Sequence, residues 1–269
     1  MKLSDKEKQR LKTAYGPWAL VTGSSSGIGL ELAHLIAGSG INIVIHGRRE
    51  DKLQAIAKAM RASYVVEVKF VAADLSEASA VDKIIAATAS LPIGLFVASA
   101  GFGTAGAFLK SSIHAELNLV QVNCLALLTL THHFSQLFSA QKRGGIILMS
   151  SIVAFQGTPY SANYSASKAY VQTLAEAISV ELKPHGIDVL AAAPGPVHSG
   201  FAHRANMKMD GAMNTARIGV PILKAMGRKS TVLPGRLSKI LFYSLSTLPR
   251  WGKIRIMEKV MRGMTAHQG

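Results

Sequence analysis

The architecture follows from one stretch near the N-terminus, Trp18-Ala-Leu-Val-Thr-Gly-Ser-Ser-Ser-Gly-Ile-Gly29. Its first five residues form an apolar run that ends on a glycine turn, which is typical of a buried strand. Residues 27–39 then place apolar side chains at helical spacing and predict a helix that Gly40 ends. A helix that begins in such a turn offers free N–H groups and the positive end of its dipole to phosphates. The stretch therefore predicts a nucleotide site, although its glycine spacing differs from the common G-x-G-x-x-G and a purely structural turn is the alternative.

Apolar runs and helical segments alternate from this stretch to about residue 195. The runs predict strands over residues 41–45, 65–71, 95–98, 145–150 and 187–192. The helical segments cover residues 50–61, 76–89 (with Ser76 as the N-terminal cap), 112–141 and 162–182. Buried strands separated by helices imply a parallel sheet that right-handed crossovers cover on both faces. We therefore predict an α/β fold, a doubly wound parallel sheet of Rossmann type.

The length suits one large α/β domain as well as two small ones, and a single domain over residues 1–269 is expected because no linker appears before residue 195. Its core is expected over about residues 15–200, followed by a substrate lid and a basic amphipathic extension over about residues 201–269. Apolar residues make up 49% of the chain, which is enough for a substantial core. The single cysteine, Cys124, excludes an internal disulfide and a cysteine-based zinc cluster, and the nine histidines show no metal-ligand spacing, so no metal is expected.

The sequence shows neither a signal peptide nor a membrane-spanning segment. Residues 1–12 lack the apolar centre of a signal peptide. No uninterrupted apolar run approaches the roughly 20 residues that cross a bilayer. A cytoplasmic location is therefore expected.

The net charge of +15 is concentrated towards the C-terminus. Residues 1–200 carry 17 basic and 13 acidic side chains, whereas residues 201–269 carry 13 basic and 2 acidic ones. This asymmetry suggests an anionic partner, with a solvated basic face as the alternative. Apolar residues recur there at helical spacing, namely Leu237, Ile240, Leu241, Leu245 and Leu248, then Trp251, Ile254, Met257, Val260, Met261 and Met264. Basic amphipathic helices of this kind suit peripheral contact with a membrane, and packing on the sheet domain or on a sister subunit is the alternative.

The residues after the second predicted strand select the cofactor. An Asp or Glu at this point would hydrogen-bond the ribose 2′-hydroxyl of NAD. This chain has His46-Gly47-Arg48-Arg49 instead. An arginine can bind a phosphate through a planar fork of donors, so NADP(H) is favoured, with Arg48 as the main contact. NAD(H) remains the alternative, in which both arginines are solvated.

A proton-transfer site is indicated by Tyr164 and Lys168, which lie four residues apart and so share one helical face. A free tyrosine has a pKa near 10, and a lysine ammonium close by would lower it. The phenol would then exchange a proton with a carbonyl oxygen, and a hydroxyl at Ser151 would hydrogen-bond the same oxygen. A surface helical contact is the alternative for the Tyr-Lys pair taken alone.

In combination, these motifs resemble the short-chain dehydrogenase/reductase family over roughly residues 15–200, and more loosely to the end. They are Thr22-Gly-Ser-Ser-Ser-Gly-Ile-Gly29, Asp74, Ala98-Ser99-Ala100-Gly101, Asn123, Ser151, Tyr164-x-x-x-Lys168 and Pro194-Gly195. The resemblance implies that Tyr164 is the acid/base, that Ser151 polarises the carbonyl and that Lys168 also binds the nicotinamide ribose. It implies that Asn123 kinks the long helix and holds a water that links Lys168 to solvent.

The resemblance also implies the cofactor contacts and the assembly. The expected contacts are Gly23, Ser25, Ser26, Gly27, Ile28, Gly29, Arg48, Arg49, Asp74, Leu75, Ala100, Gly101, Tyr164, Lys168, Pro194, Gly195, Val197 and Ser199. The family commonly pairs subunits through the helices that hold Asn123 and residues 164–168, which suggests a homodimer or homotetramer. One departure is that the family usually has Asn-Asn-Ala-Gly where this chain has Ala98 and Ser99, so hydrogen bonds must be lost or replaced there.

The expected activity is NADPH-dependent reduction of a carbonyl, or oxidation of the alcohol, on a small-molecule substrate. Apolar residues after Val197 favour a hydrophobic, lipid-like or steroid-like substrate; they are Phe201, Met207, Met209 and Met213, with Phe102 and Phe155 as further wall residues. The alternative is that they only pack the lid down. A catalytically silent nucleotide-binding scaffold or sensor is the competing function. Nucleic-acid binding is not expected, because the basic residues alternate with an apolar stripe and no nucleic-acid module is recognised.

Overall fold

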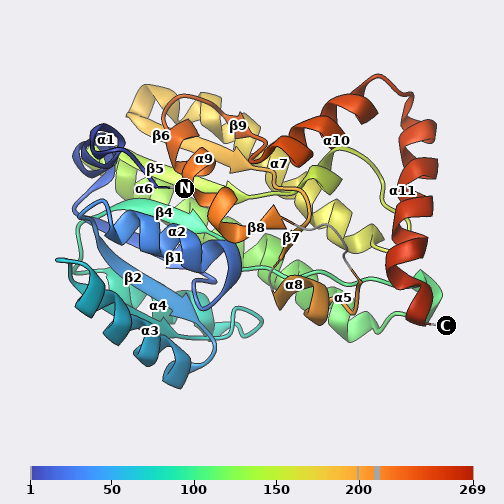
Figure 1. Ribbon diagram of the computed structural model, residues 1–269. Coiled ribbons are helices and arrows are strands. Elements are labelled where there is room, and N and C mark those ends of the chain that lie inside the picture. The colour runs from blue at the N-terminus through green and yellow to red at the C-terminus, as the bar shows by residue number, and fades with distance from the viewer. Residues whose placement is uncertain (1, 199, 209–212, 269) are drawn as a thin grey trace.

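A seven-stranded parallel sheet runs through the residues that the computed structural model describes, which are 2–198, 200–208 and 213–268 (Figure 1). Its strand order is β3-β2-β1-β4-β5-β6-β9. The strands are β1 (Trp18–Thr22), β2 (Asn42–Gly47), β3 (Val68–Ala72), β4 (Ile93–Ala98), β5 (Gly144–Met149), β6 (Ile187–Ala192) and β9 (Thr231–Val232). Because β1 pairs with both β2 and β4, the strand order reverses beside β1. The prediction of a doubly wound parallel sheet is confirmed, and ligands of such sheets bind at the carboxyl ends of the strands beside that reversal.

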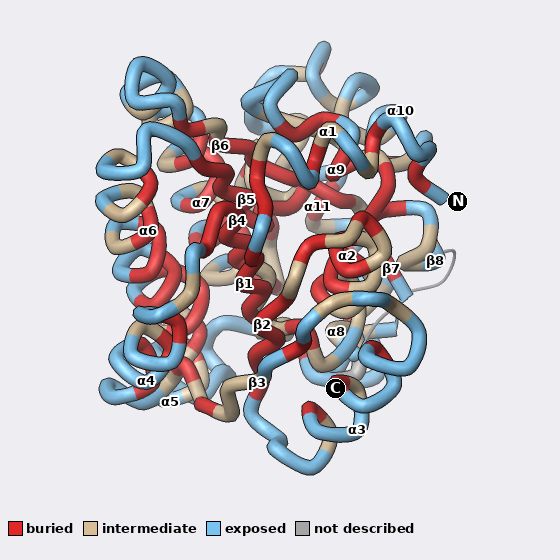
Figure 2. Tube along the Cα trace, turned by 90° about the vertical axis from the view of Figure 1, so that its left-hand side faces the viewer, coloured by how far each residue is buried: buried red, intermediate tan, exposed pale blue. Residues whose placement is uncertain are grey.

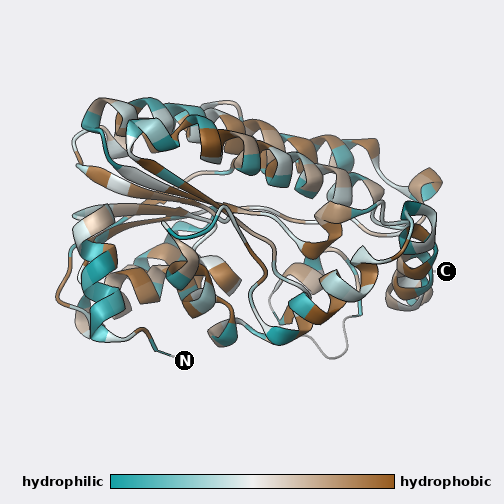
Figure 3. Ribbon diagram, turned by 90° about the horizontal axis from the view of Figure 1, so that it is seen from above, coloured by the Kyte–Doolittle hydropathy of each residue, from teal (hydrophilic) through white to brown (hydrophobic). Residues whose placement is uncertain are grey.

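Helices cover both faces of the sheet, as the prediction requires (Figure 3). One layer contains α2 (Gly27–Ala37), α3 (Glu50–Ser63) and α9 (Gly219–Ala225). The other contains α4 (Ser79–Thr88), α5 (Ile113–Val120), α6 (Leu127–Gln141) and α7 (Ala162–Glu181). Successive residues of β1 serve the two cores in turn, with Leu20 facing one and Val21 the other, and both side chains are fully buried. The buried strands lie at the centre of the molecule (Figure 2).

Two helix predictions need correction. Ser76 does not cap α4, because its N–H and hydroxyl both donate to Asp74 Oδ1, at 3.1 and 2.9 Å, and the helix begins at Ser79. The long helix predicted over residues 112–141 is interrupted by a π-helical segment, η2 (Gln121–Ala126), which contains Asn123. The whole of Ile113–Gln141 is long and apolar enough to cross a membrane by length and composition, yet nearly half of its most apolar 18-residue window is buried inside this fold.

The N-terminal helix α1 (Asp5–Tyr15) was not predicted from the sequence. It docks through long-range contacts rather than through a wide apolar face. Arg10 donates to the carbonyl oxygens of Met226 at 2.8 Å and Leu223 at 2.9 Å, which are the last acceptors of α9. The Tyr15 hydroxyl donates to Asp188 Oδ2 at 2.8 Å. The helix thereby ties the start of the chain to β6 and α9.

The C-terminal residues form a separate set of elements beyond the carboxyl ends of the strands (Figure 1). The segment that the sequence predicts to be a lid, called the lid below, contains β7 (Val197–His198), α8 (Gly200–Arg204) and β8 (Met213–Asn214), and β7 pairs with β8. After α9 and β9, which belong to the sheet domain, the chain forms α10 (Arg236–Ser246) and α11 (Arg250–Thr265). The end of α11 touches the lid, where the Lys208 N–H donates to the Met264 carbonyl oxygen at 3.0 Å. Met209, one of the predicted lid residues, lies outside the described residues.

Candidate active site

One cavity of about 1170 Å³ opens at the carboxyl ends of the strands and extends under α8, α10 and α11. It brings together almost all of the predicted site residues. The predicted residues that line it are Gly23, Ser25, Ser26, Gly27, Ile28, Gly29, Arg48, Arg49, Asp74, Leu75, Ala100, Gly101, Ser151, Tyr164, Lys168, Pro194, Gly195 and Val197. Ser199 lies outside the described residues, and Asn123 is buried behind the cavity wall.

The glycine turn is shaped for close backbone approach. Gly23 and Gly27 have φ of +68° and +61°, in the left-handed region that favours glycine. A Cβ on Gly23 would lie 2.6 Å from the Ala100 Cα, and one on Gly29 would lie 2.5 Å from the Gly23 carbonyl oxygen. The turn is therefore packed against the loop after β4, and no side chain can be accommodated at Gly23 or Gly29. A dinucleotide pyrophosphate fits this backbone cradle at the N-terminus of α2.

His46 hydrogen-bonds the glycine turn through the Gly23 N–H, a role that the sequence did not suggest. Its Nε2 faces the Ala73 carbonyl oxygen at 3.1 Å, and since a carbonyl can only accept, Nε2 carries the proton. Nδ1 then accepts from the Gly23 N–H at 3.4 Å. Burial lowers the pKa of His46 to about 4, so the ring is neutral at physiological pH.

Thr22 hydrogen-bonds the loop after β4, at the position where the sequence departs from the family motif. Its hydroxyl oxygen accepts from the N–H groups of Ser99 at 3.2 Å and Ala100 at 3.3 Å. The last residue of β1 therefore fixes the loop that follows β4, directly beside the glycine turn.

Arg48 and Asp74 form the far wall of the nucleotide end. Arg48 Nη1 lies 3.7 Å from Asp74 Oδ2. Burial opposes ionisation of Asp74, but hydrogen bonds from Ser76 and the charge of Arg48 outweigh it and lower the pKa of Asp74. Arg204 of the lid also lines this cavity, with its guanidinium carbon 3.7 Å from the Phe102 ring centroid. Nothing in the sequence marked Arg204, because its place depends on how the lid folds back.

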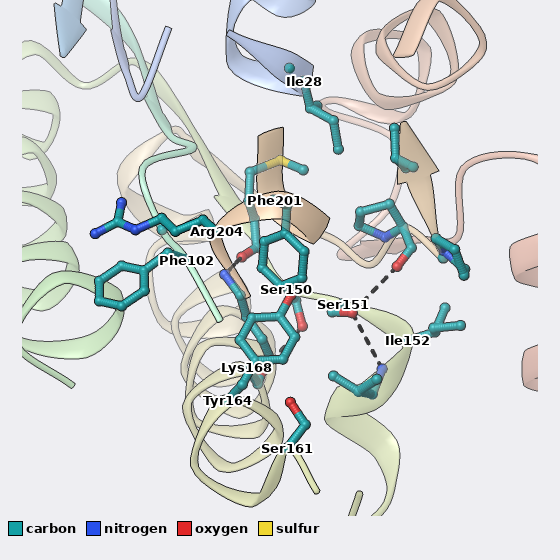
Figure 4. A pocket seen from close by; sticks show the side chains of 18 of the residues that line it. Ile28, Phe102, Ser150, Ser151, Ile152, Ser161, Tyr164, Lys168, Phe201 and Arg204 are labelled. Atoms are coloured by element: carbon teal, nitrogen blue, oxygen red, sulfur yellow. Dashed lines mark hydrogen bonds between the residues drawn. The ribbon is translucent and has the colours of Figure 1, made fainter. Parts of the chain in front are cut away.

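Tyr164, Ser151 and Lys168 meet at the other end of the cavity (Figure 4). The Ser151 hydroxyl lies 3.5 Å from the Pro194 carbonyl oxygen and accepts from the Val153 N–H at 3.4 Å. Lys168 Nζ donates to the Met149 carbonyl oxygen at 2.8 Å and lies 5.8 Å from the Tyr164 ring centroid. The three side chains come from α7 and from the loop after β5, which explains their separation in the sequence.

The model of the family described as short chain dehydrogenase matches residues 17–210. The chain belongs to this family. It is 34% identical over 179 residues to a 7beta-hydroxysteroid dehydrogenase of Collinsella aerofaciens, an alignment that covers 66% of this chain and 68% of that protein.

Two solved structures extend the comparison. A 7beta-hydroxysteroid dehydrogenase structure is 28% identical and superposes with a TM-score of 0.85 over 92% of this chain and 98% of its own. A short-chain dehydrogenase from Sphingobium yanoikuyae, in complex with NADPH, is 25% identical with a TM-score of 0.77 over 87% and 97%. The protein is therefore an oxidoreductase of the dehydrogenase/reductase type, and the comparisons give no support to a catalytically silent scaffold.

The pKa of Tyr164 is raised in this dehydrogenase, whereas the sequence predicted that it would be lowered. Burial raises the pKa of Tyr164 to about 12, and a hydrogen bond with Ser151 lowers it only in part. Burial also lowers the pKa of Lys168 to about 8, and its ammonium is engaged by Met149 instead of the phenol. The predicted lowering of the tyrosine pKa by the lysine is therefore wrong for this arrangement, because desolvation outweighs the charge effect.

The Asn123 side chain hydrogen-bonds the backbone of Phe102. Its Oδ1 accepts from the Phe102 N–H at 3.1 Å, while Nδ2 donates to the Phe102 carbonyl oxygen at 2.9 Å and to Ser167 Oγ at 3.1 Å. A Cβ on Gly101 would lie 3.0 Å from Asn123 Oδ1 and 3.5 Å from Lys168 Nζ. The π-helical segment thus links the loop after β4 to α7, close to Lys168.

The part of the cavity under α8, α10 and α11 is largely apolar and is built mostly by the C-terminal elements. Phe102, Phe201 and Met207 line it as predicted, and the Phe201 ring lies 5.0 Å from the Tyr164 ring. The helices α10 and α11 complete it, which agrees with the alternative that the apolar residues of this segment pack on the rest of the chain; the residues are Leu241, Leu245, Leu248, Met257, Met261 and Met264. Phe155 and Met213 line a different hollow. The prediction that Phe155 belongs to the wall of this cavity is therefore wrong.

Proposed function

We propose that this short-chain dehydrogenase uses NADPH to reduce the carbonyl group of a hydrophobic substrate, and oxidises the corresponding alcohol in reverse. The observation that carries the proposal is that Tyr164, Ser151 and Lys168 share one cavity with the glycine turn and Arg48. A nucleotide bound along the turn would extend to the three polar side chains. The reduced cofactor, when bound, supplies the hydride.

The residues divide the remaining work. Tyr164, with a pKa of about 12, is a protonated phenol at neutral pH and donates its proton to the carbonyl oxygen. Ser151 donates a hydrogen bond to the same oxygen as negative charge develops on it. Lys168 uses one N–H on Met149 and has two more donors for the ribose hydroxyls. Asn123 positions the Phe102 loop and α7 around them.

Three features support NADP(H) as the cofactor. Arg48 and Arg49 follow β2 where an acidic residue would select NAD(H). Arg48 lies on the cavity wall beside Asp74. The similar Sphingobium yanoikuyae dehydrogenase is solved with NADPH.

The apolar wall supports a bulky hydrophobic substrate. The side chains from α8, α10 and α11 offer Met and Leu surface that adapts to ring systems or long chains. The names of the similar 7beta-hydroxysteroid dehydrogenases are in line with a steroid-like substrate.

A panel of aldehydes and ketones with NADPH, followed by the loss of its absorbance, tests the proposal. Hydrophobic cyclic and long-chain ketones should be turned over, and small polar sugars should not. Tyr164→Phe should reduce kcat by about 10²- to 10⁴-fold with NADPH binding unchanged, because only the proton donor is removed. Full activity in Tyr164→Phe would overturn the assigned role, and the absence of NADPH-dependent turnover across the panel would overturn the function.

The assembly that we infer is a homodimer or homotetramer formed through α5, η2, α6 and α7. Large apolar side chains are exposed on these elements, among them Leu117, Leu125, Leu128 and Tyr170. These elements contact one another, and exposed apolar side chains gathered on neighbouring elements are typical of interaction sites. Sedimentation velocity should give a dimer or larger species, and Leu125→Glu with Leu128→Glu should shift it towards the monomer.

We further infer a cytoplasmic protein with peripheral membrane contact through the outer side of α10 and α11. Their inner sides line the cavity, yet Ile240 and Trp251 are 64% and 72% exposed, with Lys253 and Arg255 nearby in the sequence. A tryptophan among basic residues suits an anionic lipid interface. Sedimentation with anionic vesicles should be salt-sensitive and weakened by Trp251→Glu; binding that neither salt nor this variant changes would contradict the inference.

A further inference from the structure

A second hollow, of about 1630 Å³, lies among α9, β9, α10 and the 3-10 turn η3 (Ile152–Phe155). We call it the basic groove. Its basic lining residues are Arg217, Lys224, Arg228, Lys229, Arg236 and Lys239. Among the described lining residues, Glu176 is the only acidic one. The groove therefore concentrates positive charge beside the dehydrogenase site.

Most of this charge is available to a ligand. Arg228 is paired with Glu7 at 2.8 Å, so it belongs to the contact between α1 and the turn after α9. Glu176 accepts from Gln172 Nε2 at 2.7 Å and, at 3.3 Å, from the Thr231 hydroxyl. Within the described part of the chain, the other five cations form no ion pair, and all five are exposed: Arg217, Lys224, Lys229, Arg236 and Lys239.

The basic groove adjoins the catalytic cavity through two aromatic side chains. Phe242 of α10 lines both hollows, and Phe155 of η3 lines the groove. Their rings are in edge-to-face contact at 4.7 Å and are both partly buried. The turn η3 begins directly after Ser151, and its first residues, Ile152 and Val153, line the catalytic cavity. An apolar partition thus separates the cations from the site of carbonyl reduction.

We propose that the basic groove binds the anionic head group of an amphiphilic substrate whose apolar body, carrying the carbonyl, fills the catalytic cavity. This inference rests on the proposed carbonyl reductase function. The substrate class is then narrower than a hydrophobic ketone: an apolar ketone with a carboxylate, sulfonate or phosphate at its far end. The body would pass between Phe155 and Phe242, whose rings are in contact and must separate to admit it. Arg236 and Lys239 at the start of α10 would then meet the head group.

The charge of the groove argues against a second copy of the chain as its occupant. A symmetric dimer through this surface would place the same cations opposite one another, which is repulsive. A concave hollow that adjoins an apolar cavity instead suits a ligand with one charged and one apolar end.

A matched pair of substrates tests the proposal, namely a long-chain or polycyclic oxo acid and its methyl ester. Binding is measured by calorimetry and turnover by NADPH absorbance, at low and high salt. The acid should bind roughly tenfold more tightly than the ester at low salt, and the ratio should shrink as salt rises. Arg236→Ala with Lys239→Ala should remove most of this preference and leave kcat and KM for the ester unchanged.

Lys58→Ala with Lys83→Ala is the matched control, because it removes two exposed lysines of α3 and α4 that line neither hollow. It should keep the preference for the acid. Equal binding of acid and ester to the wild type, or equal effects of the two double variants, would overturn the proposal. So would a loss of anionic-vesicle binding in the groove variant with the acid preference intact, which would assign the groove to lipid. A failure of turnover with both compounds would count against the proposed function, while the ratio of binding constants would still decide the role of the groove.

Discussion

Arg48 is the residue that we propose to select NADPH over NADH, because it lies on the cavity wall after β2. Arg48→Ala removes a planar fork of donors beside the expected 2′-phosphate and leaves the glycine turn intact. We expect the dissociation constant for NADPH to rise by about 10-fold or more and that for NADH to change little. Fluorescence titration with both cofactors checks this. An equal loss for the two cofactors would show that Arg48 supports the fold of the site and not the phosphate.

His46 should make stability depend on pH in a defined window. Its pKa is about 4 in the folded protein and near 6.5 in an unfolded chain, so between these values the unfolded state binds more protons. Stability is therefore present above pH 6.5 and is lost as pH falls towards 4, by at most about 3 kcal/mol. Denaturant unfolding at several pH values measures the slope. His46→Asn retains an amide donor and acceptor but cannot titrate, and it should flatten the slope; an unchanged slope would assign the effect to other groups.

The elements at the C-terminus support the cofactor site as well as the substrate wall. Ser238 of α10 is fully buried; its hydroxyl donates to the Pro234 carbonyl oxygen at 2.6 Å and accepts from the Gly195 N–H at 2.8 Å. Ser238→Ala leaves the Gly195 N–H without this acceptor, so we expect a loss of about 1–2 kcal/mol in unfolding free energy and a higher KM for NADPH. Thermal and denaturant unfolding, with NADPH kinetics, measure both effects.

Ser246→Ala on the same helix is the control for Ser238→Ala. Ser246 is exposed, and its hydroxyl donates only to the Tyr243 carbonyl oxygen of its own helix, at 2.7 Å. This variant should be nearly neutral. If the two variants behaved alike, α10 would not be a support of the Gly195 loop.

The sequence predicted those elements whose signal is local. The sixth strand, residues 187–192, was predicted to the residue, because an apolar run between Gly186 and Pro194 leaves little choice of ends. The helix α1 was missed because only a few of its side chains, such as Leu11 and Tyr15, face the core. The edge strand β9 has two residues, too few for any periodic pattern. Their positions are determined by contacts with distant parts of the chain.

The same division applies to the site. Motif residues such as Tyr164 and Gly23 are recognised by their spacing to neighbouring motif residues, so the sequence could predict that they belong to one site. Arg204 and Ser238 reach that cavity only because the lid and α10 fold back over it. The tyrosine pKa could not be predicted either, because burial decides its direction and burial is a property of the assembled fold.

On the scale of the whole molecule, the uneven charge now has a structural basis. The 13 basic and 2 acidic residues over 201–269 belong to the segment that supplies the lid, α9, α10 and α11. The basic groove and the outer side of α11 divide this charge between a concave and a convex surface. The assay with matched oxo acid and ester addresses the first surface, and vesicle sedimentation addresses the second.

The docking of α1 has a consequence for how the protein is made. Arg10 caps a carbonyl that lies 216 positions further along the chain, and Tyr15 reaches an aspartate 173 positions away. During synthesis the first helix leaves the ribosome long before its partners exist, and contacts of such sequence separation form slowly. In nascent chains that stop before α9, α1 should therefore be exposed to proteases. A purification tag placed at the C-terminus would select chains that contain α9 and in which α1 can dock.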